Sequence, residues 1–527
     1  MPRIVEKSLS PETATDREAI SAALAAEAMV FSDFRILKRS VDSRQREVKI
    51  NMRIELFSAG EKISSRIQDR IFPDVQYGYP VLVVGAGPAG LFAALKLIEL
   101  GLKPVVIERG VDVRARRHDI AAIHKHHIVN PDSNYCFGEG GAGTFSDGKL
   151  YTRSTKRGDV NSILETFVQF GADESILSDA HPHIGTNKLP KIVTSLREQI
   201  IKSGGEVRFN SRLVDFSVDE KNFIHSVFLQ DENDAMHEMK CWQVVLATGH
   251  SARDIFHLLE HKKIAIEFKP FALGVRVEHL QALIDRAQYH CETRSEFLPP
   301  SSYQLVHQSG NRNAFSFCMC PGGIIAPCAT SPGEVVTNGW SPSKRNNPWA
   351  NSGIVVPVNW DDIPAVHPLG ALAGIEFQKS VEKKCWEAAG STQTIPAQRM
   401  IDFVEGKLSA TLPECSYQPG LASVRLDELL PSFIVETLRE ALVSFGKKIK
   451  GYYTNEAVLV APESRTSSPV RIPRDKEFLH HPQIHNLFPC GEGAGYAGGI
   501  VSAAIDGERV SAAVARQVRE CAEPKEC

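Results

Sequence analysis

Net charge, long apolar runs and export signals are all scarce in this sequence of 527 residues. The 60 Lys and Arg residues nearly balance 63 Asp and Glu residues, which leaves a formal net charge of −3 at pH 7. This balance gives no electrostatic reason to expect nucleic acid or an anionic membrane surface as a partner. No apolar run approaches the about 20 residues that cross a bilayer, and the first residues lack the apolar core of a secretion signal. We therefore expect no membrane span and a location in the cytoplasm.

Paired cysteine motifs are also absent, although the chain has eleven cysteines. No two of them show the Cys-x-x-Cys spacing that often marks a zinc or redox site. Cysteines without a pattern are typical of reduced thiols in a cytosolic protein. We expect no bound metal.

A dinucleotide-binding fingerprint is present in "YPVLVVGAGPAGLFAALKLIELGLKPVVIERG", residues 79–110. An apolar strand ends in Gly85-x-Gly87-x-x-Gly90, a helix follows, and a second strand ends at Glu108. The first glycine makes the tight turn, the second lets the backbone approach a pyrophosphate, and the third lets helix and strand pack closely. A carboxylate at the end of the second strand accepts hydrogen bonds from ribose hydroxyls. The predicted contacts in this unit are Gly85, Ala86, Gly87, Pro88, Ala89, Gly90, Glu108 and Arg109.

Two further stretches are predicted to run along the same cofactor. "FGEGGAGTFSDGKLYTR", residues 137–153, is too rich in glycine for a regular element; a flexible surface loop is the alternative. "QVVLATGHSARD", residues 243–254, is an apolar strand that ends in small residues, which suits a nucleotide crossing the ends of a parallel sheet. The predicted contacts here are Gly141, Ala142, Gly143, Thr144, Ala247, Thr248 and Gly249, with Leu213 from the ribbon "RLVDFSV".

The C-terminal stretch "LFPCGEGAGYAGGIVSAAIDG", residues 487–507, contains six glycines. Glycine in an ordered element costs about 0.5–1 kcal/mol relative to alanine, so this density indicates positive φ angles or a close approach to another surface. The apolar run from Ile500 to Ile505 predicts a helix that begins directly after Gly498 and Gly499. A glycine turn of this kind directs bare N–H groups and the positive end of the helix dipole toward an anionic or electron-rich ligand. The sequence thus predicts a second half of the cofactor socket, far along the chain from the first.

A fingerprint near residue 85 combined with a glycine-to-helix turn near residue 495 resembles the FAD/NAD(P)-binding flavoprotein superfamily. This superfamily includes fumarate reductase-like and D-amino-acid-oxidase-like enzymes. The resemblance implies that the cofactor is FAD, extended across the domain. It also implies that Gly491 and Glu492 hold the ribityl or phosphate end, and that the helix beginning at Gly498, Gly499 and Ile500 points at the flavin pyrimidine. Most members have Asp where this chain has Glu492, which is one methylene longer.

Several longer phrases are similar to one bacterial family within that superfamily, usually called the uncharacterised FAD-dependent dehydrogenases. The phrases are "KRSVDSR", "FGEGGAGTFSDGKLYTR", "HPHIGTNKL", "FSFCMCPGG", "ESRTSSPVRIPR" and "FPCGEGAGYAGG". They are spread over nearly the whole chain, the N-terminal region included. The similarity implies FAD and an oxidoreductase activity.

The expected fold class is α/β: a Rossmann-like, three-layer FAD/NAD(P)-binding fold, discontinuous in sequence, with an inserted α+β domain and a small N-terminal α+β domain. The expected domains are an N-terminal accessory domain (1–76), the first part of the FAD-binding domain (77–264), an inserted cap or substrate domain (265–454) and the C-terminal part of the FAD-binding domain (455–527).

Local patterns predict elements within two of these domains. Apolar residues alternate from Glu47 to Leu56, which predicts a half-buried strand. A capping box from Thr15 to Glu18 predicts the start of a helix. In the inserted domain, helices are expected within 371–389 and 429–449.

Two cysteines are candidates for contact with a substrate. Cys318 and Cys320 are two residues apart on an expected strand, so they share a face. They are either a thiol pair that faces the flavin or two small buried residues, because free cysteine is among the most buried residue types.

An arginine and a histidine are the other substrate candidates. Arg465 either clamps a substrate carboxylate with two parallel hydrogen bonds or pairs with Glu463 or Asp475 on the surface. His183, with its neighbour His181, is either an acid–base group or a structural residue.

The predicted function is an FAD-dependent oxidoreductase that transfers hydride or electrons between a small organic substrate and the flavin. FAD carries out the transfer, while the protein supplies geometry and electrostatics. The chain has no second dinucleotide fingerprint. NAD(P)H is therefore expected to react transiently where it is the electron donor, and a protein donor is the alternative.

The sequence leaves two other functions open. One is a flavoprotein that acts on or docks to a macromolecule such as tRNA through a basic strand face, although a solvated face explains the same residues. The other is a non-catalytic binding protein on the same scaffold, but the chain keeps every glycine of the socket. The basic face consists of Lys38, Arg39, Arg44, Arg46, Lys49 and Arg53.

Overall fold

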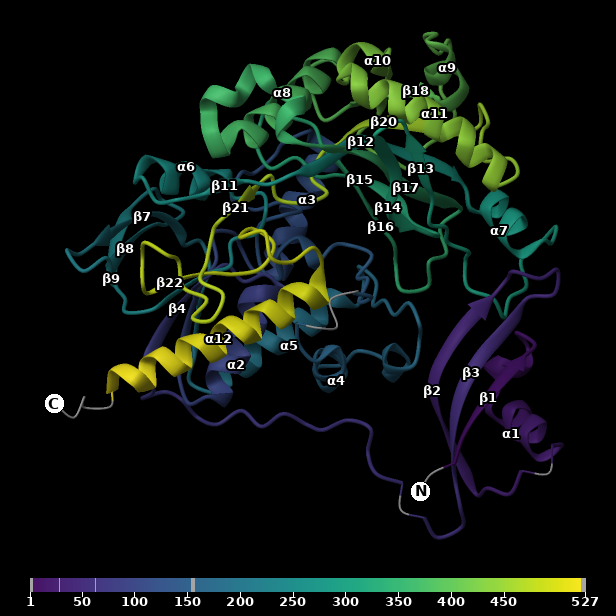
Figure 1. Cartoon of the computed structure of the whole chain (residues 1–527), viewed down its shortest axis with the longest axis horizontal. Coiled ribbons are helices and arrows are strands. Elements are labelled where there is room, and N and C mark those ends of the chain that lie inside the picture. The colour runs from purple at the N-terminus through teal and green to yellow at the C-terminus, as the bar shows by residue number, and fades with distance from the viewer. Residues whose placement is uncertain (1–2, 28, 62, 153–156, 523–527) are drawn as a thin grey trace.

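The structure is a computed structural model that describes residues 3–27, 29–61, 63–152 and 157–522 (Figure 1). Residues 137–153 are called the second glycine-rich stretch below. Its last residue, Arg153, and residues 523–527 of the expected last domain lie outside the described residues.

A five-stranded parallel sheet with the order β22-β10-β4-β5-β6 forms the base of the cofactor-binding fold. Every neighbouring pair in it is parallel. β22 comes from the C-terminal segment, so the fold is discontinuous in sequence, which confirms the predicted fold class. The strands are β4 (Pro80–Val84), β5 (Lys103–Ile107), β6 (Glu206–Arg208), β10 (Val244–Leu246) and β22 (Leu487–Pro489).

The two faces of this sheet are buried in two different cores. Val81 and Val83 of β4 pack with the helices on one face, whereas Leu82 and Val84 pack with an antiparallel ribbon and a helix on the other. Alternation of this kind follows from the period of two along a strand. Figure 1 shows the resulting three layers. The first face carries α2 (Pro88–Glu99), α4 (Val160–Gln169), α5 (Leu189–Lys202) and α12 (Ile500–Ala522), and the second carries β7 (Arg212–Val218), β8 (Ile224–Gln230), β9 (Met236–Lys240) and α6 (Arg253–His261).

Helix α12 approaches α2 too closely for a side chain to lie between the two backbones. A Cβ added to Gly507 would lie 2.2 Å from the carbonyl oxygen of Ala89. Four residues further on, the hydroxyl of Ser511 donates a hydrogen bond of 2.9 Å to the carbonyl of Ala93. Part of the glycine density in the C-terminal stretch therefore serves the packing of one helix on another.

A second sheet of seven strands, in the order β13-β14-β17-β12-β20-β18-β19, stands beside the first. Its pairs are antiparallel except β18 with β19. Helices α8 to α11 cover it and supply much of its core (Figure 1). The strands are β12 (Phe271–Leu280), β13 (Val306–Ser309), β14 (Arg312–Cys320), β17 (Trp349–Val358), β18 (Ile395–Arg399), β19 (Leu421–Ser423) and β20 (Val458–Glu463), and the helices are α8 (Ala373–Ala388), α9 (Met400–Glu405), α10 (Leu426–Leu429) and α11 (Ser432–Lys448).

The predicted helices of the inserted domain correspond to α8 and α11. β20 extends the seven-stranded sheet to Glu463, so the predicted boundary between 454 and 455 falls before its last strand in the chain. The three domain boundaries themselves stay predictions. Outside the N-terminal unit, the other α-helices and strands are α3 (Val113–His126), α7 (Gln281–Tyr289), the hairpin of β15 (Ile324–Pro327) and β16 (Thr337–Trp340), and the pair of β11 (Glu267–Phe268) and β21 (Val470–Arg471).

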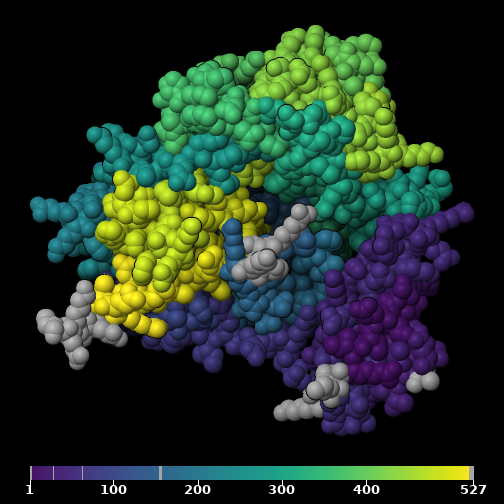
Figure 2. Space-filling model, viewed as in Figure 1, coloured from purple at the N-terminus to yellow at the C-terminus, as the bar shows by residue number. Residues whose placement is uncertain are grey.

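The N-terminal residues form a small sheet with one helix. Its strand order is β1-β3-β2, all antiparallel, and the strands are β1 (Arg3–Leu9), β2 (Asp33–Asp42) and β3 (Lys49–Phe57). The apolar residues of β3 alternate as predicted and are buried. Helix α1 (Arg17–Ala25) begins one residue later than the capping box implied: the carboxylate of Asp16, not the hydroxyl of Thr15, accepts the N–H groups of the first turn. In Figure 2 this unit is the purple lobe at one side of the molecule.

Three of the six residues of the predicted basic face have carboxylate partners within the protein. Arg39 pairs with Asp179 at 2.9 Å, and its backbone continues the edge of β2 onto residues 178–180. Arg44 pairs with Asp42, and Lys49 with Glu47. These pairs reduce the positive face that a nucleic acid would contact.

Within the described ranges, no helix combines the length and the apolar character that crossing a membrane requires.

The contact between α12 and α2 predicts the effect of enlarging Gly507. Gly507→Val forces the two helices apart, and overpacking of this kind costs about 1–3 kcal/mol. We expect the melting temperature, followed by circular dichroism, to fall by about 2–6 °C. Ala512→Val is the matched control, because Ala512 is exposed on the same helix; it costs at most about 0.7 kcal/mol through helix propensity. Since valine is a better helix former than glycine, an unchanged or higher melting temperature for Gly507→Val would contradict the packing.

Candidate active site

A cavity of about 1120 Å³ lies where the carboxyl ends of the parallel strands meet the second sheet. It is larger than the about 300–1,000 Å³ of most small-molecule sites, so it has room for a cofactor and a substrate together. In Figure 2 the surface is hollowed between the yellow C-terminal segment and the teal second domain. The predicted cofactor contacts that line the cavity are Gly85, Gly87, Pro88, Ala89, Glu108, Arg109, Gly141, Ala142, Gly143, Leu213, Ala247, Thr248, Gly249, Glu492, Gly498, Gly499 and Ile500.

Three glycines from distant parts of the chain face open space in this cavity. A Cβ added to Gly87 would meet nothing nearer than the Cα of Gly141 at 3.9 Å, and a Cβ on Gly498 or Gly499 would meet no heavy atom within 4 Å. No side chain caps the first turn of α2, for which Gly87 is the N-cap. The N–H groups of that turn are therefore available to an anion such as a pyrophosphate. The cradle fits FAD, which is flat at one end and carries a pyrophosphate in the middle.

Four predicted cofactor contacts do not line the cavity and instead hold its turns in place. The N–H of Ala86 donates to the carboxylate of Glu108 at 2.9 Å. A Cβ on Gly90 would lie 1.9 Å from the carbonyl oxygen of Gly85. The hydroxyl of Thr144 donates to the carbonyl of Glu139 at 3.0 Å. The N–H of Gly491 donates to the carboxylate of Asp506 at 2.8 Å.

Glu108 ties together the backbone turns around the cavity. Its carboxylate accepts hydrogen bonds of 2.9–3.0 Å from the N–H groups of Ala86, Gly110 and Gly138. It was predicted to accept from ribose hydroxyls, and it does line the cavity, but three of its hydrogen-bonding positions are taken by the protein. Its first role in the structure is to align the fingerprint turn with the second glycine-rich stretch.

Arg109, the next residue, is an ion-pair residue at the rim of the cavity. Its guanidinium donates to Asp132 at 2.9 Å and to both carboxylate oxygens of Asp254 at 3.0–3.1 Å. It also stacks over the ring of Phe137, 4.4 Å from the centroid.

The sequence did not single out His250, which also lines the cavity. Burial lowers the pKa of His250, and the nearby carboxylate of Glu492 offsets only part of that shift. The imidazole is therefore neutral at neutral pH. A signal was present in the sequence, because His250 directly follows Gly249 at the carboxyl end of β10, where ligands of parallel sheets bind.

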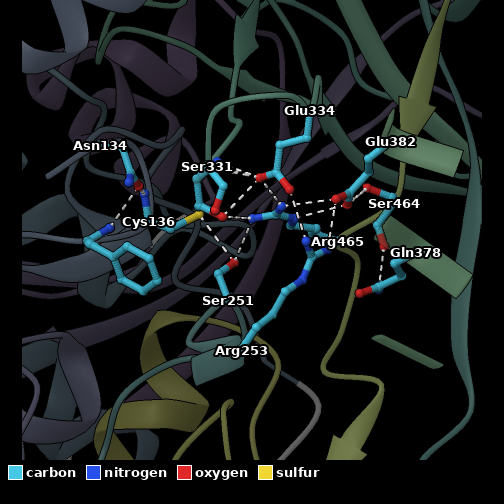
Figure 3. Close-up of polar contacts among 12 residues, drawn as sticks. Asn134, Cys136, Ser251, Arg253, Ser331, Glu334, Gln378, Glu382, Ser464 and Arg465 are labelled. Carbon is cyan, nitrogen blue, oxygen red and sulfur yellow. Dashed lines mark hydrogen bonds and ion pairs between the residues drawn. The ribbon is translucent and has the colours of Figure 1, made fainter. Parts of the chain in front are cut away.

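Arg465 is committed to the protein wall rather than to a substrate (Figure 3). Its guanidinium has five N–H groups. They are directed at Glu334 and Glu382, both of which it pairs with, and at the hydroxyls of Thr330 and Ser251. Neither alternative from the sequence holds: no N–H group is left for a substrate carboxylate, and the partners are not Glu463 or Asp475.

A second arginine completes this wall network. Arg253 also bridges the two carboxylates, at 2.9 Å to Glu334 and 2.7 Å to Glu382. Burial raises the pKa of Glu382, but Arg253 and Arg465 outweigh burial and bring the pKa to about 2. Two cations and two carboxylates thus balance each other inside the wall.

His183 does not line the cavity. Its Nε2 lies 3.1 Å from the carbonyl oxygen of Ser343, and burial lowers its pKa. The ring of His181 packs against Tyr151 instead, with centroids 5.1 Å apart. Among the described residues, no group of three or more His, Cys, Asp or Glu side chains is arranged to hold a metal.

Of the two cysteine candidates, Cys318 lines the cavity and Cys320 lies behind it, fully buried. The ammonium of Lys149 is 3.6 Å from each sulfur. Lys149 lies in the second glycine-rich stretch, and its approach to the cysteines was not predicted. No local pattern reveals a contact between residues so far apart in the chain.

Replacing Arg465 is expected to destabilise the wall. Arg465→Met leaves two buried carboxylates with one cation, a change that costs about 3–5 kcal/mol, so we expect the melting temperature to fall by about 5–10 °C. Since the pKa of Glu382 is about 2 against an ordinary 4.5, this stabilisation is complete above about pH 4.5 and disappears as the pH falls toward 2. Arg471→Met, at an exposed arginine of the same segment, is the control. If Arg465→Met and Arg471→Met were equally stable at pH 7, Arg465 would not be needed to balance the buried carboxylates and would be free to bind a substrate carboxylate.

Three family profiles match successive parts of the chain. Residues 1–57 match a domain of unknown function, DUF8436. Residues 78–254 match a profile described as "FAD binding domain". Residues 270–466 match "FAD-dependent protein, C-terminal domain-like". The cofactor of the protein is FAD.

Solved flavoprotein structures align with most of the chain at low similarity. CtdE in complex with FAD is 12% identical, with a TM-score of 0.34, over 83% of this chain and 84% of CtdE. A geranylgeranyl bacteriochlorophyll reductase-like protein from Thermoplasma acidophilum is 13% identical, with a TM-score of 0.34, over 84% of this chain and 79% of that one.

One relative is much nearer in sequence. A Clostridium beijerinckii protein named "Uncharacterized protein" is 39% identical over 495 residues, which cover 90% of this chain and 91% of the relative. With this relative, the chain belongs to the bacterial family of FAD-dependent flavoprotein oxidoreductases in which an FAD binding domain is followed by the FAD-dependent protein C-terminal domain.

Proposed function

We propose that the protein is an FAD-dependent dehydrogenase or reductase that transfers hydride or electrons between a small organic substrate and the flavin. The observation that carries the proposal is that one cavity is shared by two kinds of wall. One wall is the bare glycine cradle of Gly87, Gly498 and Gly499, and the other is formed by side chains of the second sheet and of the hairpin β15–β16. When a cofactor lies against the glycine wall, the rest of the cavity, next to the side chains of the second sheet and the hairpin, is left for a small molecule.

FAD supplies two-electron chemistry when it is bound, and the residues of this chain position it and set its surroundings. The first turn of α2 offers N–H groups to the pyrophosphate. The start of α12 at Ile500 presents the positive end of a helix dipole, which favours negative charge in front of it. His250, half-buried and neutral because desolvation lowers its pKa, is able to accept a proton inside the cavity.

The electron donor is proposed to be NAD(P)H, which would enter the cavity transiently, or a protein. The cavity, at about 1120 Å³, is large enough for a nicotinamide nucleotide to bind transiently beside the flavin.

Gly87→Val is expected to abolish the retention of FAD without unfolding the protein. The backbone at Gly87 has φ −76° and ψ −177°, an extended conformation that valine adopts without strain. A branched side chain there fills the cradle where the pyrophosphate lies, so the purified variant should lack the flavin absorption of the wild type. Its melting temperature should equal that of the wild type stripped of FAD. Gly87→Ala should retain an intermediate amount, and full retention by Gly87→Val would show that the cofactor lies elsewhere.

An anaerobic titration tests the proposed activity. We expect NADPH or NADH to bleach the oxidised flavin band of the purified protein, and dithionite to bleach it fully. Gly87→Val protein is the control, because any oxidation of nucleotide that persists in it does not pass through the flavin. A band that dithionite bleaches but neither nucleotide touches would exclude NAD(P)H as donor and leave a protein donor or the substrate itself. A protein that takes up no flavin even after reconstitution would contradict the proposal.

A further inference from the structure

Cys318 and Cys320 lie at a distortion in the wall of the cavity. β14 pairs in register with β17 as far as Phe317, and the register shifts between Phe317 and Cys320. Cys318 has a φ of +48°, in the left-handed region that non-glycine residues rarely occupy. Such a conformation is strained and persists where the surrounding structure enforces it. Bulges of this kind re-aim side chains, often next to active sites.

The distortion brings both sulfurs to one cation. The Nζ of Lys149 is 3.6 Å from the sulfur of Cys318 and 3.6 Å from that of Cys320. The thiol of Cys320 donates to the carbonyl oxygen of Cys318 at 3.2 Å. Cys318 and Lys149 line the cavity, and the Lys149 side chain is 34% exposed, whereas Cys320 is 0% exposed. A reactant in the cavity therefore meets Cys318 first, with Cys320 directly behind it.

One ion pair beside the cysteines is balanced. Arg276 and Glu463, both buried, pair at 2.8 Å, and Glu463 also lines the cavity. The pair is neutral as a whole, although its cation, Arg276, acts on the Cys318 thiol.

The charges around Lys149 are not balanced by carboxylates. Asp147, almost fully buried, accepts from Arg345 at 2.7 Å and lies 3.8 Å from Lys149. Burial keeps the pKa of the nearby His183 low, so the imidazole adds no charge at neutral pH. Two cations thus share one carboxylate, and a single thiolate at Cys318 neutralises the cluster.

The electrostatics of the two thiols differ accordingly. A hydrogen bond between the two cysteine side chains, with the charges of Lys149 and Arg276, holds the pKa of Cys318 well below its usual range despite burial. The same hydrogen bond, together with burial, raises the pKa of Cys320. In Cys385 and Cys490, which lie elsewhere in the protein, burial raises the thiol pKa.

We propose that Cys318 and Cys320 are a redox-active thiol pair and that the small organic substrate of the site is a low-molecular-weight disulfide, which reacts at Cys318. This inference rests on the proposed function, because it names the substrate class of that same cavity.

The chemistry is a thiol–disulfide exchange in two steps. The Cys318 thiolate attacks one sulfur of the substrate, a mixed disulfide forms, the substrate S–S bond breaks, and half of the substrate leaves as a thiolate. Cys320 then loses its proton to that thiolate, and its sulfur attacks the sulfur of Cys318. The Cys318–Cys320 disulfide forms, and the second half of the substrate leaves as a thiolate.

The overall exchange balances in atoms and charge. One substrate disulfide becomes one thiol and one thiolate, while the pair loses two electrons and one proton. The pair returns to thiolate and thiol when it regains two electrons and one proton, which the proposed oxidoreductase activity supplies.

The first test measures the reactivity of Cys318 in the full-length, reduced protein. Alkylation by iodoacetamide is followed by peptide mass spectrometry as a function of pH. We expect the midpoint for Cys318 to lie well below the ordinary thiol value of about 8.5. Lys149→Met should move the midpoint upward toward that value, and Lys149→Arg, which keeps the charge, should restore much of the shift. An ordinary midpoint in the wild type, or one that Lys149→Met does not move, would overturn the proposal.

The second test follows the exchange itself with glutathione disulfide as the probe, under anaerobic conditions. We expect the wild type to lose two hydrogens and to protect both cysteines from alkylation. Cys320→Ser should stop at a mixed disulfide of glutathione with Cys318, Cys318→Ser should not react at this site, and Cys385→Ser should behave as the wild type. Free thiols at both positions in the wild type, or a wild type that stops at the mixed disulfide, would overturn the proposal.

The Gly87→Val protein separates this inference from the proposed function. The exchange needs no flavin, so the variant should form the Cys318–Cys320 disulfide as the wild type does. If the exchange takes place but no donor reduces the flavin of the wild type, the result counts against the proposed function alone. If the flavin is reduced but Cys318 and Cys320 do not react with the disulfide, the result counts against the thiol pair alone.

Discussion

The close packing of helix α12 on helix α2 is the constraint on which the cavity depends. Gly507 lets the backbone of α12 rest on the carbonyl of Ala89, in the first turn of the helix that the fingerprint glycines begin. This contact fixes the start of α12, and with it Gly498 and Gly499, on the same cavity that Gly87 lines. Residues more than 400 positions apart in the chain thereby share one ligand surface. The glycines of the C-terminal stretch thus serve two needs: some allow helix packing, and others leave room for the cofactor.

Two charge clusters beside the cavity have different balances. In the first, Arg253 and Arg465 meet Glu334 and Glu382, and every charge has its partner (Figure 3). A balanced cluster of this kind shapes the wall and offers nothing to a reactant. In the second, Lys149 and Arg345 share Asp147. This cluster has one more cation than carboxylates, and its excess positive charge faces the thiols of the bulged strand β14. The proposed reactive residues therefore lie beside the cluster that is not neutral.

The parts of the fold that follow local patterns were predictable from the sequence. The fingerprint from Gly85 to Gly90 and the alternation along β3 depend on neighbours a few residues apart, and both appear in the structure where the sequence indicated. β1 was not predicted: none of its seven residues, "RIVEKSL", is fully buried, so no apolar pattern marks the strand, and its partner β3 lies far along the chain. The helix cap moved by one residue because the carboxylate of Asp16 is in reach of two N–H groups of the first turn.

The site residues show the same difference between features set by near neighbours in the chain and features set by distant contacts. Backbone requirements such as those of Gly87 and Gly498 are local and were readable. Partners of charged side chains were not: Arg465 meets carboxylates 83 and 131 residues away, and Lys149 meets sulfurs 169 and 171 residues away. Glu108 shows a third case, in which the residue was identified but its carboxylate is used largely by backbone N–H groups.

The measurement that tests this account most directly is a crystal structure of the protein with FAD bound. The account predicts that the pyrophosphate lies against Gly87 at the start of α2. It also predicts that the flavin ring lies in the part of the cavity bounded by Gly498, Gly499 and Cys318. A flavin ring turned away from Cys318, or an FAD bound outside the glycine cradle, would contradict it.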